Sequence, residues 1–146
     1  MSTTKMHIRV KVTRHFDATA ERVFDAWLDP KTAGKWMFAT PTGQMVRADI
    51  EPREGGAFCM VDRRDGKDVT HLGEYLEIDR PRRLVFMFSV DGSESSRVIV
   101  DIVPLAAGCD VTLTNEIPPA WAEYATRSEE GWRTMLDALA ATLGKQ

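Results

Sequence analysis

The feature that most constrains the fold is a series of short segments in which apolar and polar residues alternate, separated by tight turn signals. In the first segment, residues 6–16, Val10 and Val12 share one face, and Arg9, Lys11 and Thr13 lie on the other. A period of two is typical of a strand with one buried face. The pairs Asp65-Gly66 and Asp91-Gly92 are hairpin signals. The pattern therefore predicts an antiparallel, meandering sheet.

The same pattern predicts six further strands, at residues 44–50, 57–62, 69–78, 84–90, 97–103 and 109–115. Gly73 is expected to mark a bulge or a close approach of another group. Glu74 shares the parity of Leu76 and Ile78, which turns it inward unless a bulge shifts the phase. Asp101 directly follows Val100, which shares one face with Val98 and Ile102, and Asp101 is therefore expected to face outward.

Two short helices and one long one are predicted around these strands. Thr19 is a suitable N-cap for the first helix, and Asp29-Pro30 ends it and starts the second. Apolar residues step by three or four from Pro118 to Leu143, which predicts a helix of roughly 25 residues. With 146 residues, the chain is expected to form one domain, residues 1–146. The fold class is α+β, with the sheet curled around the long helix.

Composition and charge exclude several classes of protein. The net charge of −3 argues against nonspecific nucleic-acid binding, which needs a basic surface. No apolar run approaches the length of a membrane span, so no membrane insertion is expected. The first residues lack the apolar segment of a signal peptide, which favours a cytoplasmic location. Cys59 and Cys109 are expected to be buried free thiols.

We find no catalytic or metal-binding motif in the sequence. His7, His15 and His71 are too scattered for a metal site, although His71 could lie at the mouth of a cavity. Carboxylates occur on or beside strands, and an inward one with a raised pKa could act as a general acid or base; they are Asp62, Glu74, Glu77, Asp101 and Glu116. No catalytic residue, metal or cofactor is assigned, and the protein is not expected to be an enzyme.

Four segments in order resemble one known family. They are residues 16–30 followed by Trp36, residues 51–58, residues 73–86, and Glu130-Gly131-Trp132. Together they resemble the START-like (SRPBCC) superfamily, in the branch named for homology to the activator of the heat-shock-protein-90 ATPase (AHSA-type). The resemblance implies a helix-grip fold: a curved antiparallel sheet of about seven strands, with two short helices and a long C-terminal helix over a cavity. Relatives use that cavity for largely apolar molecules, and a few are cyclases or dehydratases of aromatic polyketides.

The expected function is binding of a small hydrophobic or amphipathic ligand in the cavity between the sheet and the C-terminal helix. Aromatic residues and methionines either fill this space as a solid core or line a pocket. The predicted ligand-binding residues are Trp36, Phe38, Phe58, Met60, Tyr75, Phe86, Trp121, Tyr124, Ser128, Trp132 and Met135. Two alternatives stay open: a cofactor-independent enzyme of the polyketide cyclase/dehydratase type, which predicts an inward ionisable group, and a co-chaperone-like protein-interaction module. Exposed edge strands also permit a homodimer.

Overall fold

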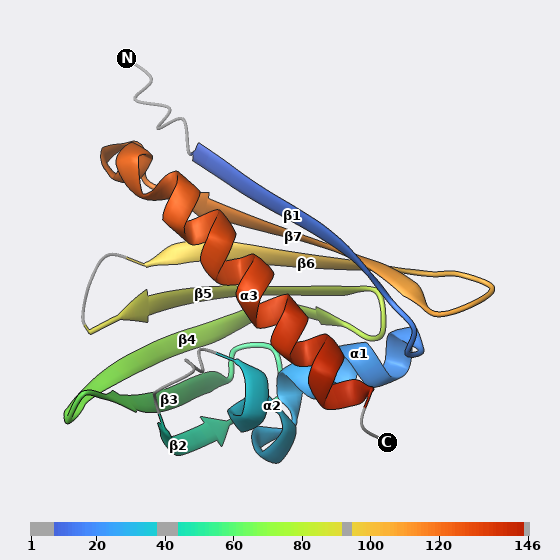
Figure 1. The fold of residues 1–146 in the computed structure, drawn as a ribbon, viewed down its shortest axis with the longest axis horizontal. Helices are drawn as coiled ribbons and strands as arrows, with labels where there is room; N and C mark the ends of the chain where they lie inside the picture. The colour runs from blue at the N-terminus through green and yellow to red at the C-terminus, as the bar shows by residue number, and fades with distance from the viewer. Residues whose placement is uncertain (1–7, 38–43, 92–94, 145–146) are drawn as a thin grey trace.

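A computed structural model describes residues 8–37, 44–91 and 95–144. It contains a seven-stranded antiparallel sheet in the order β1-β7-β6-β5-β4-β3-β2. The strands are β1 (Ile8–Phe16), β2 (Gln44–Ile50), β3 (Ala57–Arg64), β4 (Lys67–Asp79), β5 (Arg83–Val90), β6 (Ser96–Pro104) and β7 (Cys109–Ile117). The sheet is curved and crossed on its concave face by one long helix (Figure 1), so the predicted α+β helix-grip fold is confirmed.

The strands follow one another as hairpins from β2 to β7, and β1 pairs with β7. Asp65 and Gly66 have φ values of 50° and 78°, the left-handed backbone that a tight hairpin turn requires. Strands β1 and β2 form the two edges of the sheet. Every predicted strand exists, and most extend by one or two residues beyond the expected range.

The two short helices are α1 (Ala20–Leu28) and α2 (Pro30–Trp36). The Thr19 side chain accepts a hydrogen bond from the Arg22 backbone N–H at 3.2 Å, as expected of an N-cap. Pro30 occupies the start of α2, where its missing N–H removes no helical hydrogen bond.

The last helix is shorter than predicted. Residues Pro119–Tyr124 form a 3-10 helix, η1, and the α-helix α3 spans only Ala125–Leu143. Within η1, Trp121 has φ −100° and ψ 20°, a non-helical backbone conformation that kinks the segment before α3 begins at Ala125. The apolar spacing runs through both elements, so periodicity alone could not locate this break.

Helix α3 buries one side against the concave face of the sheet. Trp132, Leu136 and Leu139 are almost fully buried, as are Val100 and Leu113 on the strands that lie across from them. At its C-terminal end, the carbonyl of Leu143 accepts a hydrogen bond from Arg22 of α1 at 2.9 Å. Figure 1 shows α3 running diagonally over the sheet towards α1 and α2.

A bulge in β4 decides which residues of this strand point inward. The pairing of β4 with β5 shifts between Tyr75 and Glu77, which leaves Leu76 as the extra residue. Glu74 is therefore exposed on the outer face, while Ile78 after the bulge packs against the core. The inward orientation considered for Glu74 is wrong, because the shift separates its phase from that of Ile78.

Other polar expectations concern the outer surface. Asp101 faces away from the core and accepts a hydrogen bond from Arg83 at 2.8 Å. His15 is exposed beside Asp110, at 2.9 Å, and His7 lies outside the described residues. Cys109 is a buried free thiol as expected, whereas Cys59 is free but only half-buried.

Candidate functional site

The concave face near the β3–β4 hairpin carries two buried polar side chains, Asp62 and His71. Asp62 pairs with Val69 across β3 and β4, and Met60 pairs with His71. Residues directly opposite each other in a sheet point to the same face. Both side chains therefore lie on the face that carries Met60, which is fully buried. We call Asp62 and His71 the inner pair.

Asp62 is only half satisfied. Its Oδ2 accepts a hydrogen bond from Arg64 Nε at 2.5 Å, and the side chain of Asp62 is 1% exposed. Its other oxygen, Oδ1, is buried and has no hydrogen-bond partner among the described residues. A buried acceptor without a partner is unfavourable by about 1–3 kcal/mol. Such an atom calls for a specific explanation.

His71 is held next to this carboxylate. Its Nδ1 lies 3.3 Å from the carbonyl oxygen of Met60, which can only accept a hydrogen bond. Burial lowers the pKa of His71, and the neighbouring carboxylate of Asp62 opposes that shift. A neutral imidazole can donate from Nδ1 to this carbonyl. The inner pair thus places a carboxylate and an imidazole on the same face, in a largely apolar setting.

Apolar side chains around the inner pair point inward but are only partly buried. Val90 pairs with His71, and Phe88 pairs with Gly73. Val90 and Phe88 are half-buried, as are Val69, Met45 on β2 and Met135 on α3. Phe88, Met45 and Met135 pack against the core cluster. Further along the same face, Val98 and Val100 of β6 and Val111 and Leu113 of β7 are completely buried, so the half-buried apolar side chains gather around the inner pair.

A second polar group joins α3 to the sheet. Asn115 Oδ1 accepts hydrogen bonds from Ser128 Oγ at 3.0 Å and Trp132 Nε1 at 3.2 Å. Its Nδ2 donates to Ser96 Oγ and to the Arg97 carbonyl, both at 3.1 Å. The Asn115 amide thus uses both of its N–H donors and both acceptor positions of its oxygen. We call Asn115, Ser96, Ser128 and Trp132 the Asn115 network; it links α3 to β6 and β7, and the Asn115 amide itself offers no open group to a ligand.

Aromatic rings connect the network to the inner pair's end of the sheet. The Trp132 ring meets Phe88 edge-on at 5.8 Å between centroids, and Phe88 lies 6.3 Å from Phe86. Phe58 then contacts both Phe86 and Tyr75, each at 5.6 Å. Burial raises the pKa of the Tyr75 phenol, which therefore stays protonated. The rings form one continuous apolar layer under α3.

Gly73 allows this layer to reach β4. A Cβ atom at Gly73 would lie 2.0 Å from the Phe58 ring and 2.7 Å from the Met87 carbonyl oxygen. The close approach predicted for Gly73 is confirmed, and the approaching group is an aromatic ring. At Gly131 of α3, by contrast, a Cβ would meet no described atom within 4 Å.

The predicted site residues that the structure describes fall into three groups. The concave face and the facing side of α3 bring together Phe58, Met60, Tyr75, Phe86, Ser128, Trp132 and Met135. Trp36 packs edge-on against Trp27 at 4.6 Å and donates to the Ala26 carbonyl, within the helical layer. On η1, Trp121 is half-buried and Tyr124 is 52% exposed. Phe38 lies outside the described residues.

Sequence reasoning named Asp62 only as one of five carboxylates that could act if they pointed inward, and it did not single out Phe88 or Val90. The signal existed for Asp62, because it continues the alternation of Phe58 and Met60 on β3. A charged residue is unusual at a strand position where the alternation predicts an apolar one, and Asp62 could have been interpreted as an inward-facing group on this ground. Phe88 and Val90 follow in the same way from the parity of Phe86.

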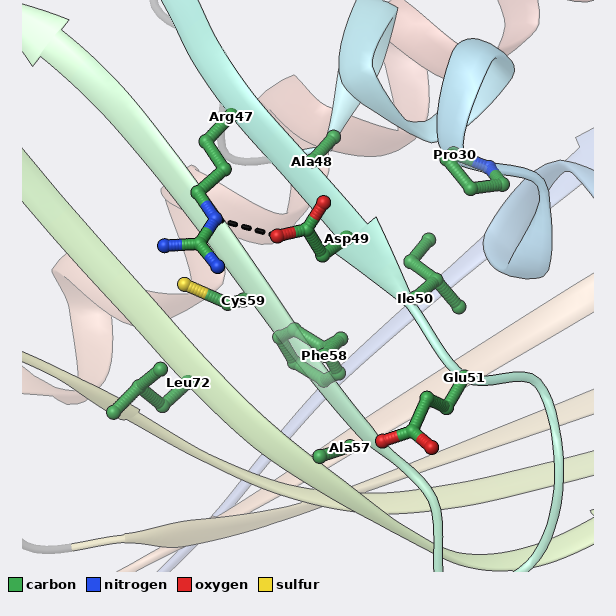
Figure 2. A pocket seen from close by; sticks show the side chains of 10 residues that line it. All are labelled: Pro30, Arg47, Ala48, Asp49, Ile50, Glu51, Ala57, Phe58, Cys59 and Leu72. Atoms are coloured by element: carbon green, nitrogen blue, oxygen red, sulfur yellow. Dashed lines mark hydrogen bonds and ion pairs between the residues drawn. The ribbon is translucent and has the colours of Figure 1, made fainter.

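A separate open hollow of about 420 Å³ lies around edge strand β2 (Figure 2). Of the residues predicted for the ligand-binding cavity, only Phe58 lines it. Arg47 and Asp49, which belong to the outer face, are hydrogen-bonded to each other there. Their mutual pairing leaves this hollow without an unpaired charge from either residue. We therefore take the concave face, and not this edge, as the candidate site.

Within residues 8–37, 44–91 and 95–144, no three His, Cys, Asp or Glu side chains gather where they could hold a metal ion. No helix in the described part of the chain has the length and apolar character needed to cross a membrane.

Comparison with known proteins identifies similar chains. A family model described as "Activator of Hsp90 ATPase homolog 1-like protein" matches residues 17–144. Protein CV1439 from Chromobacterium violaceum has 27% identity and a TM-score of 0.82, over 91% of this chain and 95% of that one. The AHSA1-like protein from Aeromonas hydrophila has 20% identity and a TM-score of 0.81, over 94% and 93%.

A structural likeness also extends to a larger protein. DynU16, a protein in the dynemicin biosynthetic locus, has 19% identity and a TM-score of 0.76, over 93% of this chain and 47% of that one. No curated protein matches the sequence.

Proposed function

The chain belongs to the family of Activator of Hsp90 ATPase homolog 1-like proteins, and we propose that it binds a small hydrophobic or amphipathic molecule between the sheet and α3. The resemblance to that family, expected from the sequence, is confirmed. The observation that carries the proposal is the set of inward-facing but half-buried apolar side chains around the inner pair. They include Phe88, Val90 and Met135.

This arrangement supports ligand binding for a physical reason. Apolar side chains that point into a fold gain about 25 cal/mol for each Å² removed from water. Phe88 and Met135 keep part of that surface exposed although both pack against the core. A bound apolar molecule that covers them gains the remaining free energy. The buried aromatic layer behind them supplies a rigid wall.

The experiment is a titration with Nile red, a neutral dye whose fluorescence rises in apolar surroundings. Met135→Trp enlarges a half-buried side chain on the inner side of α3 and is expected to weaken Nile red binding at least about tenfold by occupying the site. Met87→Trp makes the same change on the outer face of β5 and serves as the control. Loss of binding in Met135→Trp alone supports the proposal. Absence of saturable binding to the folded wild-type protein, or equal loss in both variants, contradicts it.

A cofactor-independent enzyme is the second candidate, and the observation in its favour is the inner pair itself. A neutral histidine beside a carboxylate can take up a proton from a carbon next to a carbonyl group. The test is incorporation of deuterium into the methyl group of 2-acetonaphthone in D2O, followed by NMR. Faster exchange with wild type than with His71→Gln favours the enzyme; equal rates remove this candidate.

The remaining expectations belong to the same proposal. We place the protein in the cytoplasm, and cell fractionation tests this location. A homodimer through the edge strands β1 or β2 is tested by analytical ultracentrifugation. The co-chaperone alternative predicts association with the heat-shock-protein-90 ATPase and stimulation of its rate, which a direct ATPase assay measures.

A further inference from the structure

The unpartnered Asp62 Oδ1 indicates more about the ligand than apolar character. This atom is a hydrogen-bond acceptor, is buried, and has no donor among the described residues. Ordinary protein interiors satisfy such atoms with protein groups or ordered water. Among the described residues, Trp27 Nε1 is the other buried side-chain atom without a partner. It belongs to α1, where the ring meets Trp36 of α2 edge-on at 4.6 Å, and not to the strands that carry the inner pair.

The charge of Asp62 is already balanced. Arg64 Nε donates to Oδ2, and the Arg64 side chain is 36% exposed, so the guanidinium remains partly hydrated. A cation placed at Oδ1 would lie near this guanidinium and would have to lose its own hydration. An anion there would meet the carboxylate. A neutral O–H or N–H group satisfies Oδ1 without either penalty.

The surroundings of Asp62 define the rest of the ligand. Its neighbours on the same face are Val69, directly opposite, and Met45 on the other side. His71 is the next residue of β4 on this face. Beyond it come Val90 and Phe88. The polar end of a molecule bound here would meet Asp62 Oδ1, and its body would cover apolar side chains.

Resting on the proposed function, we propose that Asp62 is the polar anchor of the site and that the ligand is a neutral amphipathic molecule bearing a hydroxyl or N–H donor at one end. This inferred class of ligand excludes fatty-acid-like anions and protonated amines as preferred ligands. It also gives a reason for a carboxylate at a position that otherwise continues an apolar face.

The test compares compounds of similar shape as competitors of Nile red. The donor compound is 2-naphthol, and 2-methoxynaphthalene has a similar ring but no donor. The cation is 2-naphthylmethylammonium and the anion is 2-naphthoate. We expect 2-naphthol to bind wild type at least about tenfold more tightly than the other three, as fits a hydrogen bond to a charged acceptor. Equal binding of 2-naphthol and 2-methoxynaphthalene overturns the inference while leaving the proposed function intact.

Variants assign the preference to Asp62. Asp62→Leu removes the acceptor and should abolish the preference for 2-naphthol while Nile red still binds. Asp68→Leu is the matched control, since Asp68 lies on the same hairpin, pairs with Arg63 at 2.8 Å and is exposed. It should retain the full preference. Persistence of the preference in Asp62→Leu contradicts the role of Asp62, whereas failure of every probe to bind folded wild type contradicts the proposed function as well.

Folding stability provides an independent readout. If Asp62 has a structural role, its replacement should destabilise the protein. If Asp62 is retained for binding, the urea midpoint of Asp62→Leu should equal or exceed that of wild type, because the Arg64 guanidinium can turn to solvent. A clear fall in the midpoint favours a structural role and overturns the inference. Should Asp62→Leu not fold, Asp62→Asn keeps the shape with an uncharged acceptor, and the preference should fall by several-fold.

Discussion

Trp132 of α3 donates a hydrogen bond from Nε1 to Asn115 Oδ1 of β7 at 3.2 Å, and the same indole ring meets Phe88 of β5 edge-on at 5.8 Å. One side chain thus fixes the helix to β7, packs against β5 and forms a wall of the proposed site. The hydrogen bond to Asn115 fixes the position of the indole ring, and in that position the ring packs against Phe88. Stability and binding should therefore be separable at Asn115 and at Phe88.

Replacing Asn115 should destabilise the protein strongly. Asn115→Ala removes the acceptor of Ser128 and Trp132 and the donor to Ser96, leaving buried polar groups unsatisfied. We expect a loss of about 2–4 kcal/mol in the free energy of unfolding, measured in urea. Thr112→Ala on the same strand, whose hydroxyl contacts the exposed Thr13 at 3.3 Å, should stay within about 0.5 kcal/mol of wild type. Similar losses in both variants would show that the network has no special role.

Two glycine-to-alanine changes should have opposite effects. Gly73→Ala introduces a Cβ within 2.0 Å of the Phe58 ring and should destabilise by at least about 1–3 kcal/mol. Gly131→Ala adds a methyl group in open space inside a helix and should stabilise by about 0.5–1 kcal/mol. Thermal unfolding of both variants measures this contrast. A destabilised Gly131→Ala would indicate that something approaches the helix there.

Protonation of His71 should lower stability. Its folded-state pKa is depressed, chiefly by burial. The unfolded chain therefore binds a proton first as pH falls below about 6.5, and the free energy of unfolding decreases until the folded-state pKa is reached. His71→Gln should flatten the unfolding free energy over this range. A titration of His71 by NMR with a pKa above the ordinary value would contradict the account.

The exposed His15 should act in the opposite direction. Its pKa is raised, first by the hydrogen bond to Asp110. Its contribution to stability is present below about pH 6.5 and disappears as pH rises through the folded-state pKa. His15→Gln should remove this dependence and leave that of His71 unchanged. Urea unfolding of the two single variants across the same pH series distinguishes the two histidines.

The ion pair between Asp25 and Arg80 predicts a small acid effect. The hydrogen bond from Arg80 Nε, at 2.7 Å, lowers the pKa of Asp25. Its stabilisation is present above the ordinary value near 3.9 and is lost as pH falls through the lower folded-state pKa. Both side chains are 54% exposed, so we expect only a slight difference between wild type and Asp25→Asn. A double-mutant cycle with Arg80→Gln in urea measures it, and a coupling near zero at neutral pH would show the pair to be unimportant.

Much of the fold followed from local pattern in the sequence. The turn at Asp65-Gly66 and the alternation along each strand predicted all seven strands, because one face of each is less exposed than the other. The break at Trp121 and the bulge at Leu76 could not be found this way. Both depend on tertiary packing, which overrides a periodicity that continues through them.

The site was less accessible to sequence reasoning than the fold. Aromatic residues at inward positions could be identified, but Tyr124 shows that helical spacing alone does not bury a residue. The state of Asp62 depends on how many of its oxygens find donors, and donors such as Arg64 become neighbours only through the fold. Parity could indicate an inward carboxylate, yet only the hydrogen-bond pattern shows that one oxygen lacks a partner.

The most direct measurement of ligand binding on the concave face is an NMR titration of protein labelled with carbon-13 at the methionine methyl groups. Met60 and Met135 lie on the inner side, and Met87 on the outer face of β5 provides the internal control. On saturation with 2-naphthol, the account predicts shifts of the Met60 and Met135 signals with the Met87 signal unchanged. Binding that saturates while Met87 moves as much as the inner methionines, or while neither inner signal moves, would contradict it.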